Sequence, residues 1–181
     1  MRIIAGRYRG RKLTGVNGHM IRPTSDRVRE AVFNILGTKV RHACVLDLFA
    51  GTGALGLEAL SRGARRAVFA DRDCTTLKAN TELCRLKEKS EIICCDIMAD
   101  NILEQRLKNT EFDLIFMDPP YHKGFLEHML KQDFLPDIMH KNTIIIAEHH
   151  FSENIRIDPS RLDIYRQKKY SKTIISFINK K

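Results

Sequence analysis

The sequence lacks any apolar run close to the ~20 residues that a membrane-spanning helix needs. Its basic start, MRIIAGRYRG, also lacks the longer apolar core of a secretory signal peptide. It contains no internal repeat, no low-complexity linker and no G-K-[ST] loop for a nucleoside triphosphate. We therefore expect no membrane association and a cytoplasmic location.

Cysteine is present, but not in a pattern that binds zinc or builds a disulfide framework. There are five cysteines, an odd number, and no two form a C-x-x-C pair. Cys94 and Cys95 are adjacent in a stretch typical of a strand, which would send their side chains to opposite faces. We interpret the cysteines as reduced core residues and expect no metal site.

The positive charge is concentrated at the front of the chain. Residues 1–42 hold ten of the 31 Lys and Arg residues but only two of the 22 acids, so the rest of the chain is nearly neutral. A solvated basic face could explain this. The alternative is a surface for a polyanion, since each Lys or Arg on a phosphate strengthens binding through counterion release.

Hydrophobic patterning separates a basic extension, residues 1–42, from a larger domain, residues 43–181. The extension contains two short β-prone pieces around a Gly/Arg turn, which predict a hairpin, and then an amphipathic helix capped by Thr24 or Ser25 and ended by Gly37. Arg27, Arg29 and Glu30 would lie on the exposed side of that helix.

The larger domain alternates strands with helices, which predicts an α/β fold with a mostly parallel sheet. The predicted strands are 44–49, 67–70, 91–95, 112–117 and 142–148, and the predicted helices are 54–62, 73–87, 99–109 and 124–135. The tail has two further β-prone pieces without a helical period. We expect seven strands in all, with an antiparallel C-terminal strand in a hairpin at the edge.

A glycine motif follows the first strand of this domain. Gly51, Gly53 and Gly56 have the G-x-G-x-x-G spacing that lets a backbone approach a ligand at a helix N-terminus. Asp71 comes 20 residues after the first glycine, at the end of the second strand, where it could accept bonds from a ribose. Nicotinamide dinucleotides and S-adenosylmethionine both fit this pair of features.

Asp47 and the segment Asp118–Tyr121 favour the second cofactor. A negative charge at Asp47, inside the first strand, would suit the cationic methionine part of S-adenosylmethionine. The Asp-Pro-Pro-Tyr corner has no role in hydride transfer. It can instead hold an exocyclic amine, because the Asp118 carboxylate and the Pro119 carbonyl can accept its N–H groups and bend it out of the ring plane. Pro119 and Pro120 would stiffen the corner. Tyr121 would offer a face on which an extruded base can stack.

The quoted residues resemble a known family. RIIAG…RGRKL…RPTSDRVREAVFNIL, followed by VLDLFAGTGALGLEALSRGA and MDPPY, is similar over nearly the whole chain to the RsmD-type 16S ribosomal RNA guanine-N2 methyltransferases. The resemblance implies a Rossmann-like class I methyltransferase fold and S-adenosylmethionine as cofactor. It also implies 16S ribosomal RNA as partner, either naked, within an assembly intermediate or within the small ribosomal subunit.

The resemblance assigns roles to individual residues. Asp71 would hold the ribose hydroxyls, Asp96 the adenine amine, and the loop 49–53 the methionine part. Many relatives carry Glu where this chain has Asp71. The predicted cofactor site is Asp47, Phe49, Ala50, Gly51, Gly53, Asp71, Asp96 and Ile97, and the predicted catalytic residues are Asp118, Pro119, Pro120 and Tyr121.

The basic extension would then bind RNA. The candidates are Arg7, Arg9, Arg11, Lys12, Arg22 and Arg27. Alternatives remain: a DNA adenine-N6 methyltransferase could use the same corner, glutamine-amide methylation is a weaker rival because Asn is usual at position 118, and a non-catalytic RNA-binding protein could retain the fold. The lysines at 168, 169 and 172 are expected on a solvated strand edge, and His149 at the surface.

Overall fold

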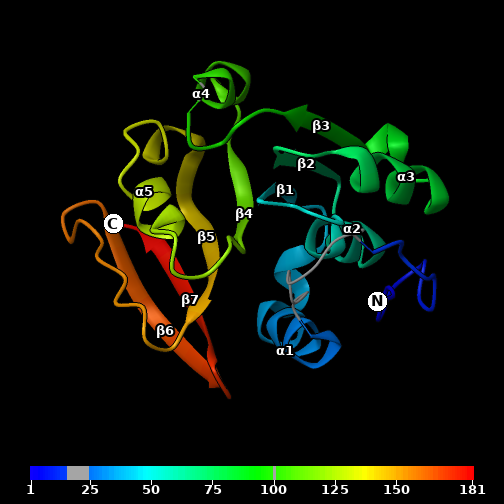
Figure 1. Cartoon of the computed structure of the whole chain (residues 1–181), viewed down its shortest axis with the longest axis horizontal. Coiled ribbons are helices and arrows are strands. Elements are labelled where there is room, and N and C mark those ends of the chain that lie inside the picture. Colours follow the sequence, from blue (N-terminus) through cyan, green and yellow to red (C-terminus); the bar gives the residue numbers. More distant parts are fainter. Residues whose placement is uncertain (16–24, 100) are drawn as a thin grey trace.

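The computed structural model describes residues 1–15, 25–99 and 101–181, and a sheet of seven strands lies at its centre. The strands are β1 (Cys44–Leu48), β2 (Arg66–Asp71), β3 (Ser90–Cys94), β4 (Phe112–Met117), β5 (Met139–His150), β6 (Leu162–Tyr170) and β7 (Thr173–Lys180). They lie in the order β3-β2-β1-β4-β5-β7-β6 (Figure 1). The pairs among β1 to β5 are parallel, whereas β7 runs antiparallel to both of its neighbours.

This topology confirms the predicted α/β fold with a mostly parallel, seven-stranded sheet. Every residue of β1 is buried, Asp47 included, as the largely apolar sequence predicts for a strand covered on both faces. The C-terminal hairpin is also present. The second strand of this hairpin, β7, pairs antiparallel with β5, so β6 forms the outermost strand of the sheet.

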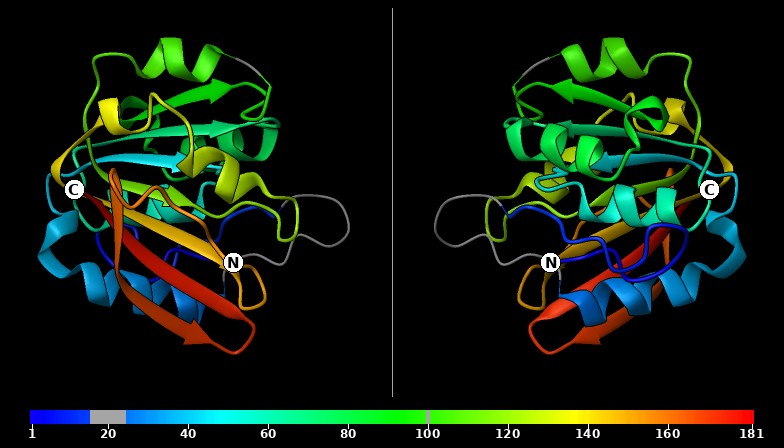
Figure 2. Two further views of the ribbon diagram at one scale, coloured as in Figure 1. Left: turned by 90° about the vertical axis from the view of Figure 1, so that its left-hand side faces the viewer. Right: turned by 90° about the vertical axis from the view of Figure 1, so that its right-hand side faces the viewer.

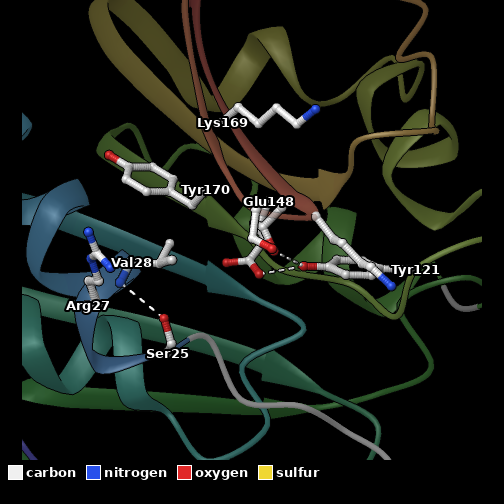
Figure 3. A pocket seen from close by; sticks show the side chains of 10 residues that line it. Ser25, Arg27, Val28, Tyr121, Glu148, Lys169 and Tyr170 are labelled. Carbon is white, nitrogen blue, oxygen red and sulfur yellow. Dashed lines mark hydrogen bonds between the residues drawn. The ribbon is translucent and has the colours of Figure 1, made fainter.

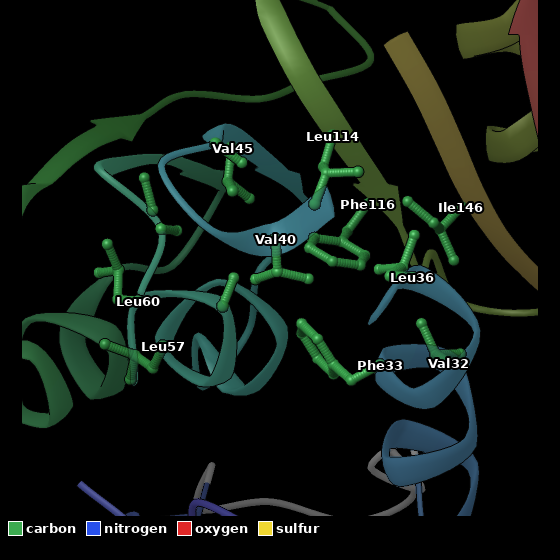
Figure 4. Close-up of a cluster of buried hydrophobic side chains, with 14 of the residues drawn as sticks. Val32, Phe33, Leu36, Val40, Val45, Leu57, Leu60, Leu114, Phe116 and Ile146 are labelled. Carbon is green, nitrogen blue, oxygen red and sulfur yellow. The ribbon is translucent and has the colours of Figure 1, made fainter. Parts of the chain in front are cut away.

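Helices cover both faces of the sheet. One face carries α1 (Asp26–Leu36), α2 (Ala54–Ser61) and α3 (Thr75–Leu83), and the other carries α4 (Ile102–Leu107) and α5 (Phe125–Leu130). Figure 4 shows Phe33 of α1 and Leu57 of α2 packed with Val45 and Phe116 of the sheet. The helix α1 lies at the same end of the sheet as the β6–β7 hairpin (Figure 2).

Local chemistry sets where the helices begin and end. Ser25 caps α1 as expected, because its Oγ accepts a bond of 3.2 Å from the Val28 N–H, and Gly37 ends the helix with φ of 54°. Thr24, the other candidate cap, lies outside the described residues. The later helices are shorter than predicted, because Arg85 and Asn109 turn to positive φ and Pro136 opens a separate 3-10 turn, Pro136–Ile138.

The N-terminal segment forms the predicted hairpin, which packs on α2. Its two pieces run antiparallel around a bridge between Arg2 and Lys12, and backbone bonds join Ile3 N to Arg11 O (2.9 Å) and Leu13 N to Met1 O (3.1 Å). The Glu58 carboxylate of α2 accepts from Ile4 N (2.7 Å) and Ala5 N (3.0 Å), so these backbone donors are used by a helix and not by a partner strand. At Gly6, with φ of 84°, a Cβ would lie 2.0 Å from the Ser61 carbonyl oxygen, so only glycine permits this approach.

Arg29 is buried, so the expectation that it lies on the exposed side of α1 is wrong. Its side chain is fully buried, and its Nη2 donates to the Arg2 carbonyl (2.5 Å) and to Asp26 Oδ1 (3.0 Å). Burial lowers the pKa of the guanidinium, against the opposing effect of Asp26. Arg29 therefore ties the N-terminal segment to α1 and is not available at the surface.

The expectation that all five cysteines are reduced is wrong for two of them. Cys74 and Cys94 form a disulfide, with their Cα atoms 5.9 Å apart, while Cys44, Cys84 and Cys95 are buried. Cys94 is exposed and Cys95 buried, as strand alternation predicts. Among the described residues, no helix combines the length and apolar character that crossing a membrane requires.

Candidate active site

The acidic residues that follow the strands lie at one level of the sheet edge. In the parallel register, Leu48 of β1 is opposite Ala70 of β2 and Met117 of β4, and Met117 is opposite Ala147 of β5. Asp71, Asp118 and Glu148 each come one residue later. The fold therefore brings together side chains that the sequence separates by up to 77 residues.

The loop after β1 bends sharply and is open on one side. Phe49, Gly51 and Gly53 all have positive φ, of 60°, 54° and 77°. A Cβ at Gly51 would meet no atom within 4 Å, so the loop presents bare backbone there. A Cβ at Gly56, in contrast, would lie 2.3 Å from the Phe69 ring, so the third glycine of the motif allows helix α2 to pack on the sheet.

Asp47 lies beneath this loop, almost completely buried. Its Oδ2 accepts a 2.8 Å bond from the Gly56 N–H at the start of α2. Burial raises the pKa of Asp47 well above its ordinary value, the Gly56 bond opposes this rise, and the charges of Asp118 and Asp71 add to it. The negative charges of Asp118 and Asp71 therefore act on Asp47.

Asp71 is the last residue of β2, and Asp96 lies in the loop that follows β3. Asp71 Oδ2 accepts from Gly51 N (2.7 Å) and its Oδ1 from Asp73 N (3.1 Å), so the acid fixes the glycine loop directly. Each carboxylate oxygen has two lone pairs, which leaves acceptor capacity for a diol. Asp96 Oδ1 accepts from Met98 N (3.1 Å), and Ile97 packs in the core below.

The corner Asp118–Tyr121 lies beside the glycine loop, as the shared register of β1 and β4 requires. The rings of Phe49 and Phe125 stack with centroids 6.0 Å apart, which joins the loop to the helix that follows the corner. Pro119 is buried, whereas Pro120 is exposed. Tyr121 is half-buried, and its hydroxyl donates to Glu148 Oε1 (2.7 Å) and lies 3.0 Å from Thr173 Oγ1.

A cavity of about 380 Å³ opens next to Tyr121 (Figure 3). Its lining comes from the start of α1, the corner, the end of β5 and the β6–β7 turn; it is Ser25, Arg27, Val28, Tyr121, Glu148, Lys169, Tyr170, Ser171, Lys172 and Thr173. The sequence analysis selected only Tyr121 and Arg27 from this set. Glu148 was noticeable as the acid after the fifth strand, but nothing in the sequence marked the β6–β7 turn.

Several residues have positions that differ from expectation. Lys169, on the outermost strand β6, and Lys172, in the β6–β7 turn, are exposed as expected, but they also line the cavity. His149 is buried, with its Nε2 2.9 Å from Ser176 Oγ, and burial lowers its pKa. It is therefore a core residue.

The predicted RNA-binding residues divide into two groups. Arg7, Arg9, Lys12 and Arg27 are exposed, whereas Arg11 donates from Nη1 to the Leu83 carbonyl (2.9 Å) and lies over the Tyr8 ring at 5.0 Å. Arg22 lies outside the described residues. Within the described ranges, no cluster of three or more His, Cys, Asp or Glu side chains could hold a metal ion.

Comparison with known proteins shows the family to which the chain belongs. The model of the family described as "Conserved hypothetical protein 95" matches residues 1–179. The chain belongs to this family. Its relatives include proteins named "Ribosomal RNA small subunit methyltransferase D", and the predicted resemblance to the RsmD-type methyltransferases is confirmed.

Two such relatives and one solved structure illustrate the similarity. The Haemophilus influenzae relative is 38% identical over 152 residues, covering 82% of this chain and 78% of its own length. The Escherichia coli K12 relative is 36% identical over 174 residues, covering 93% and 84%. The solved structure "Putative methyltransferase yhhF from Escherichia coli" has 33% identity and a TM-score of 0.82, and the match covers 100% of this chain and 98% of that chain.

Proposed function

We propose that this member of the "Conserved hypothetical protein 95" family transfers a methyl group from S-adenosylmethionine to the N2 amine of one guanine in 16S ribosomal RNA. The observation that carries the proposal is the register of β1, β4 and β5, which sets the Asp118–Tyr121 corner beside the glycine loop. The names of the relatives support ribosomal RNA over DNA as the substrate. An enzyme acting on this substrate would work in the cytoplasm.

The residues present fit the cofactor. The glycine loop with Phe49 and Ala50 would receive the methionine part over the bare backbone at Gly51, Asp71 the ribose hydroxyls, and Asp96 with Ile97 the adenine. Asp47 would support the loop from below through Gly56. When bound, S-adenosylmethionine supplies a methyl group activated by the positive sulfur.

The corner would prepare the amine. The Asp118 carboxylate and the Pro119 carbonyl accept its two N–H groups, turn its lone pair out of the ring plane and hold that direction. As the new N–C bond forms, the amine loses one proton, and Asp118 is placed to accept it. Tyr121, fixed by Glu148 and Thr173, gives the extruded base a stacking face.

The extension 1–42 would act as the RNA-binding front of the catalytic domain 43–181. Arg7, Arg9 and Lys12 expose their charges on the N-terminal segment, and Arg27 lies at the cavity. Phosphates held by these side chains would orient the RNA without reading its bases.

A methyl-transfer assay tests the proposal. Purified protein is incubated with labelled S-adenosylmethionine and either 16S ribosomal RNA or small subunits, and the RNA is digested and analysed by mass spectrometry. We expect N2-methylguanosine at one position. Asp118→Ala should abolish transfer but still bind the cofactor in calorimetry, whereas Asp71→Ala should weaken cofactor binding at least tenfold. Asp163→Ala, an exposed acid on β6, is the control. Label found only in methyladenine or in protein would overturn the proposal.

A further inference from the structure

The cavity beside Tyr121 is lined by residues from the start of α1, the end of β5 and the β6–β7 turn. Its volume of about 380 Å³ falls in the range of ~300–1,000 Å³ typical of small-molecule sites. It adjoins the corner that would hold the reacting amine. A nucleobase extruded from RNA is the ligand that must occupy this position if the proposed function is correct, on which this inference rests.

Glu148 supplies the buried acid of this cavity. The residue is only 7% exposed, and it belongs to the same face of β5 as Ile144 and Ile146, which pack toward α1. In Figure 3 its carboxylate lies between Tyr121 and the side of the cavity formed by α1. It comes at the same level of the sheet as Asp118 on the adjacent strand. Two acids from neighbouring strands therefore border the space in which a base would lie.

The hydrogen bonds around Glu148 fix its direction. Burial raises the pKa of Tyr121, so the phenol keeps its proton and donates it to Glu148 Oε1. Thr173 holds the same phenol from the other side. The two oxygens of a carboxylate can accept about four bonds, so Glu148 can hold Tyr121 and accept from a ligand as well.

Guanine is the base whose edge matches an acid. Its Watson–Crick edge carries an N1–H donor next to the N2 amine, and the two donors point in the same direction. Adenine has an acceptor at N1, which a carboxylate would repel. We propose that Glu148 is the specificity residue of this enzyme: it accepts the N1–H of the target guanine and thereby selects guanine and directs its N2 amine toward Asp118.

The cationic rim fits a nucleotide and not a free base. Arg27, Lys169 and Lys172 come from α1 and from the β6–β7 turn and expose their charges around the opening. They can hold the phosphates that flank an extruded nucleotide, as positively charged side chains do in nucleic-acid sites generally.

The test uses a base that keeps the amine but lacks the N1–H. The guanine that the wild-type enzyme methylates is mapped, and ribosomal RNA is prepared with 2-aminopurine at that position. Wild-type enzyme should prefer guanine by at least tenfold in kcat/KM. In Glu148→Gln the side-chain amide can donate to N1 of 2-aminopurine, so the guanine preference should fall at least tenfold relative to wild type.

Glu153→Gln is the matched control. Glu153 also supports the corner, since its Oε1 accepts from His122 N (2.9 Å), but it does not line the cavity. A residue that merely holds the corner should change the rates on both RNAs together and leave the preference as it is. We expect this of Glu153→Gln and not of Glu148→Gln.

The outcomes separate this inference from the proposed function. If wild-type enzyme methylates no guanine, the proposed function fails. If it methylates guanine and 2-aminopurine RNA equally, or if Glu148→Gln keeps the wild-type preference, the role of Glu148 is wrong while guanine methylation stands. The wild-type comparison decides the matter even if Glu148→Gln does not fold.

Discussion

Replacing Glu58 by Gln should destabilise the protein strongly, although the two side chains have nearly the same shape. The Glu58 carboxylate is fully buried and accepts from three donors: Ile4 N at 2.7 Å, Ala5 N at 3.0 Å and Arg62 Nε at 2.7 Å. A glutamine can keep its oxygen facing Ala5 and Arg62, but its NH₂ group then meets the Ile4 N–H, donor against donor. The N-terminal segment would lose its anchor on α2.

The magnitude follows from the bonds that change. A hydrogen bond to a charged group contributes about 1.5–3 kcal/mol, and an unpaired buried donor costs a further ~1–3 kcal/mol. We therefore expect a loss of about 3 kcal/mol, which corresponds to a fall in Tm of roughly 6–12 °C for a chain of this size. Urea unfolding followed by circular dichroism, together with a thermal scan, measures both quantities.

Glu82→Gln is the control for this prediction. Glu82 pairs with Lys87 at 3.4 Å, and both side chains are more than half exposed, so the same chemical change should alter stability by less than ~0.5 kcal/mol. If Glu58→Gln proves as harmless as Glu82→Gln, the N-terminal segment does not depend on this carboxylate, and the reasoning is refuted.

Two further predictions concern charge. The pKa of Asp47 is raised in the folded state, so above pH 3.8, the ordinary pKa of the group, the folded protein holds a proton that the unfolded chain has released, and Asp47 lowers the stability as pH rises. Asp47→Asn should therefore flatten the profile of stability against pH between pH 4 and 7, measured by urea titration. Parallel profiles for the variant and the wild type would contradict this. Replacing Arg7 and Arg9 by Ala should reduce the salt dependence of RNA binding by up to ~0.7–0.9 log unit per lost phosphate contact. Replacing Lys108 and Lys141, which are exposed near the amino ends of β4 and β5, should leave it unchanged. If both double variants show the same slope of log affinity against log salt concentration, the RNA binds elsewhere.

The parts of the fold that follow from periodicity were predictable. Mostly apolar runs predicted the strands β1 to β5, and the helical patterns between them predicted that these strands are parallel. Both predictions depend only on which residues of a segment are buried. The capping of α1 by Ser25 and its end at Gly37 were predictable for a similar reason: both depend on residues adjacent in sequence.

Contacts between distant segments were not predictable. The N-terminal hairpin was predictable, but its attachment to α2 was not, because Glu58 accepts from Ile4 N and Ala5 N and nothing near residue 58 indicates that partner. Arg29 has the spacing of an exposed helix position, yet the N-terminal segment covers it. The pairing of Cys74 with Cys94 likewise follows from the adjacency of the ends of β2 and β3, which a count of cysteines does not contain.

The candidate site shows the same division. The Gly51 loop, Asp71 and the Asp118–Tyr121 corner have motif spacing, and the sequence predicts them as site residues for that reason. Glu148 and the β6–β7 turn have none, since they become part of the cavity only when β7 inserts beside β5.

The insertion of β7 beside β5 has a consequence for biosynthesis. The ribosome releases the segments for the glycine loop and the Asp118–Tyr121 corner well before Thr173, whose hydroxyl lies 3.0 Å from that of Tyr121. A nascent chain can therefore assemble its cofactor loop while the phenol still lacks one of its supports and the outer cavity wall is missing. The cavity is therefore completed only after β7 has been synthesised and has inserted between β5 and β6.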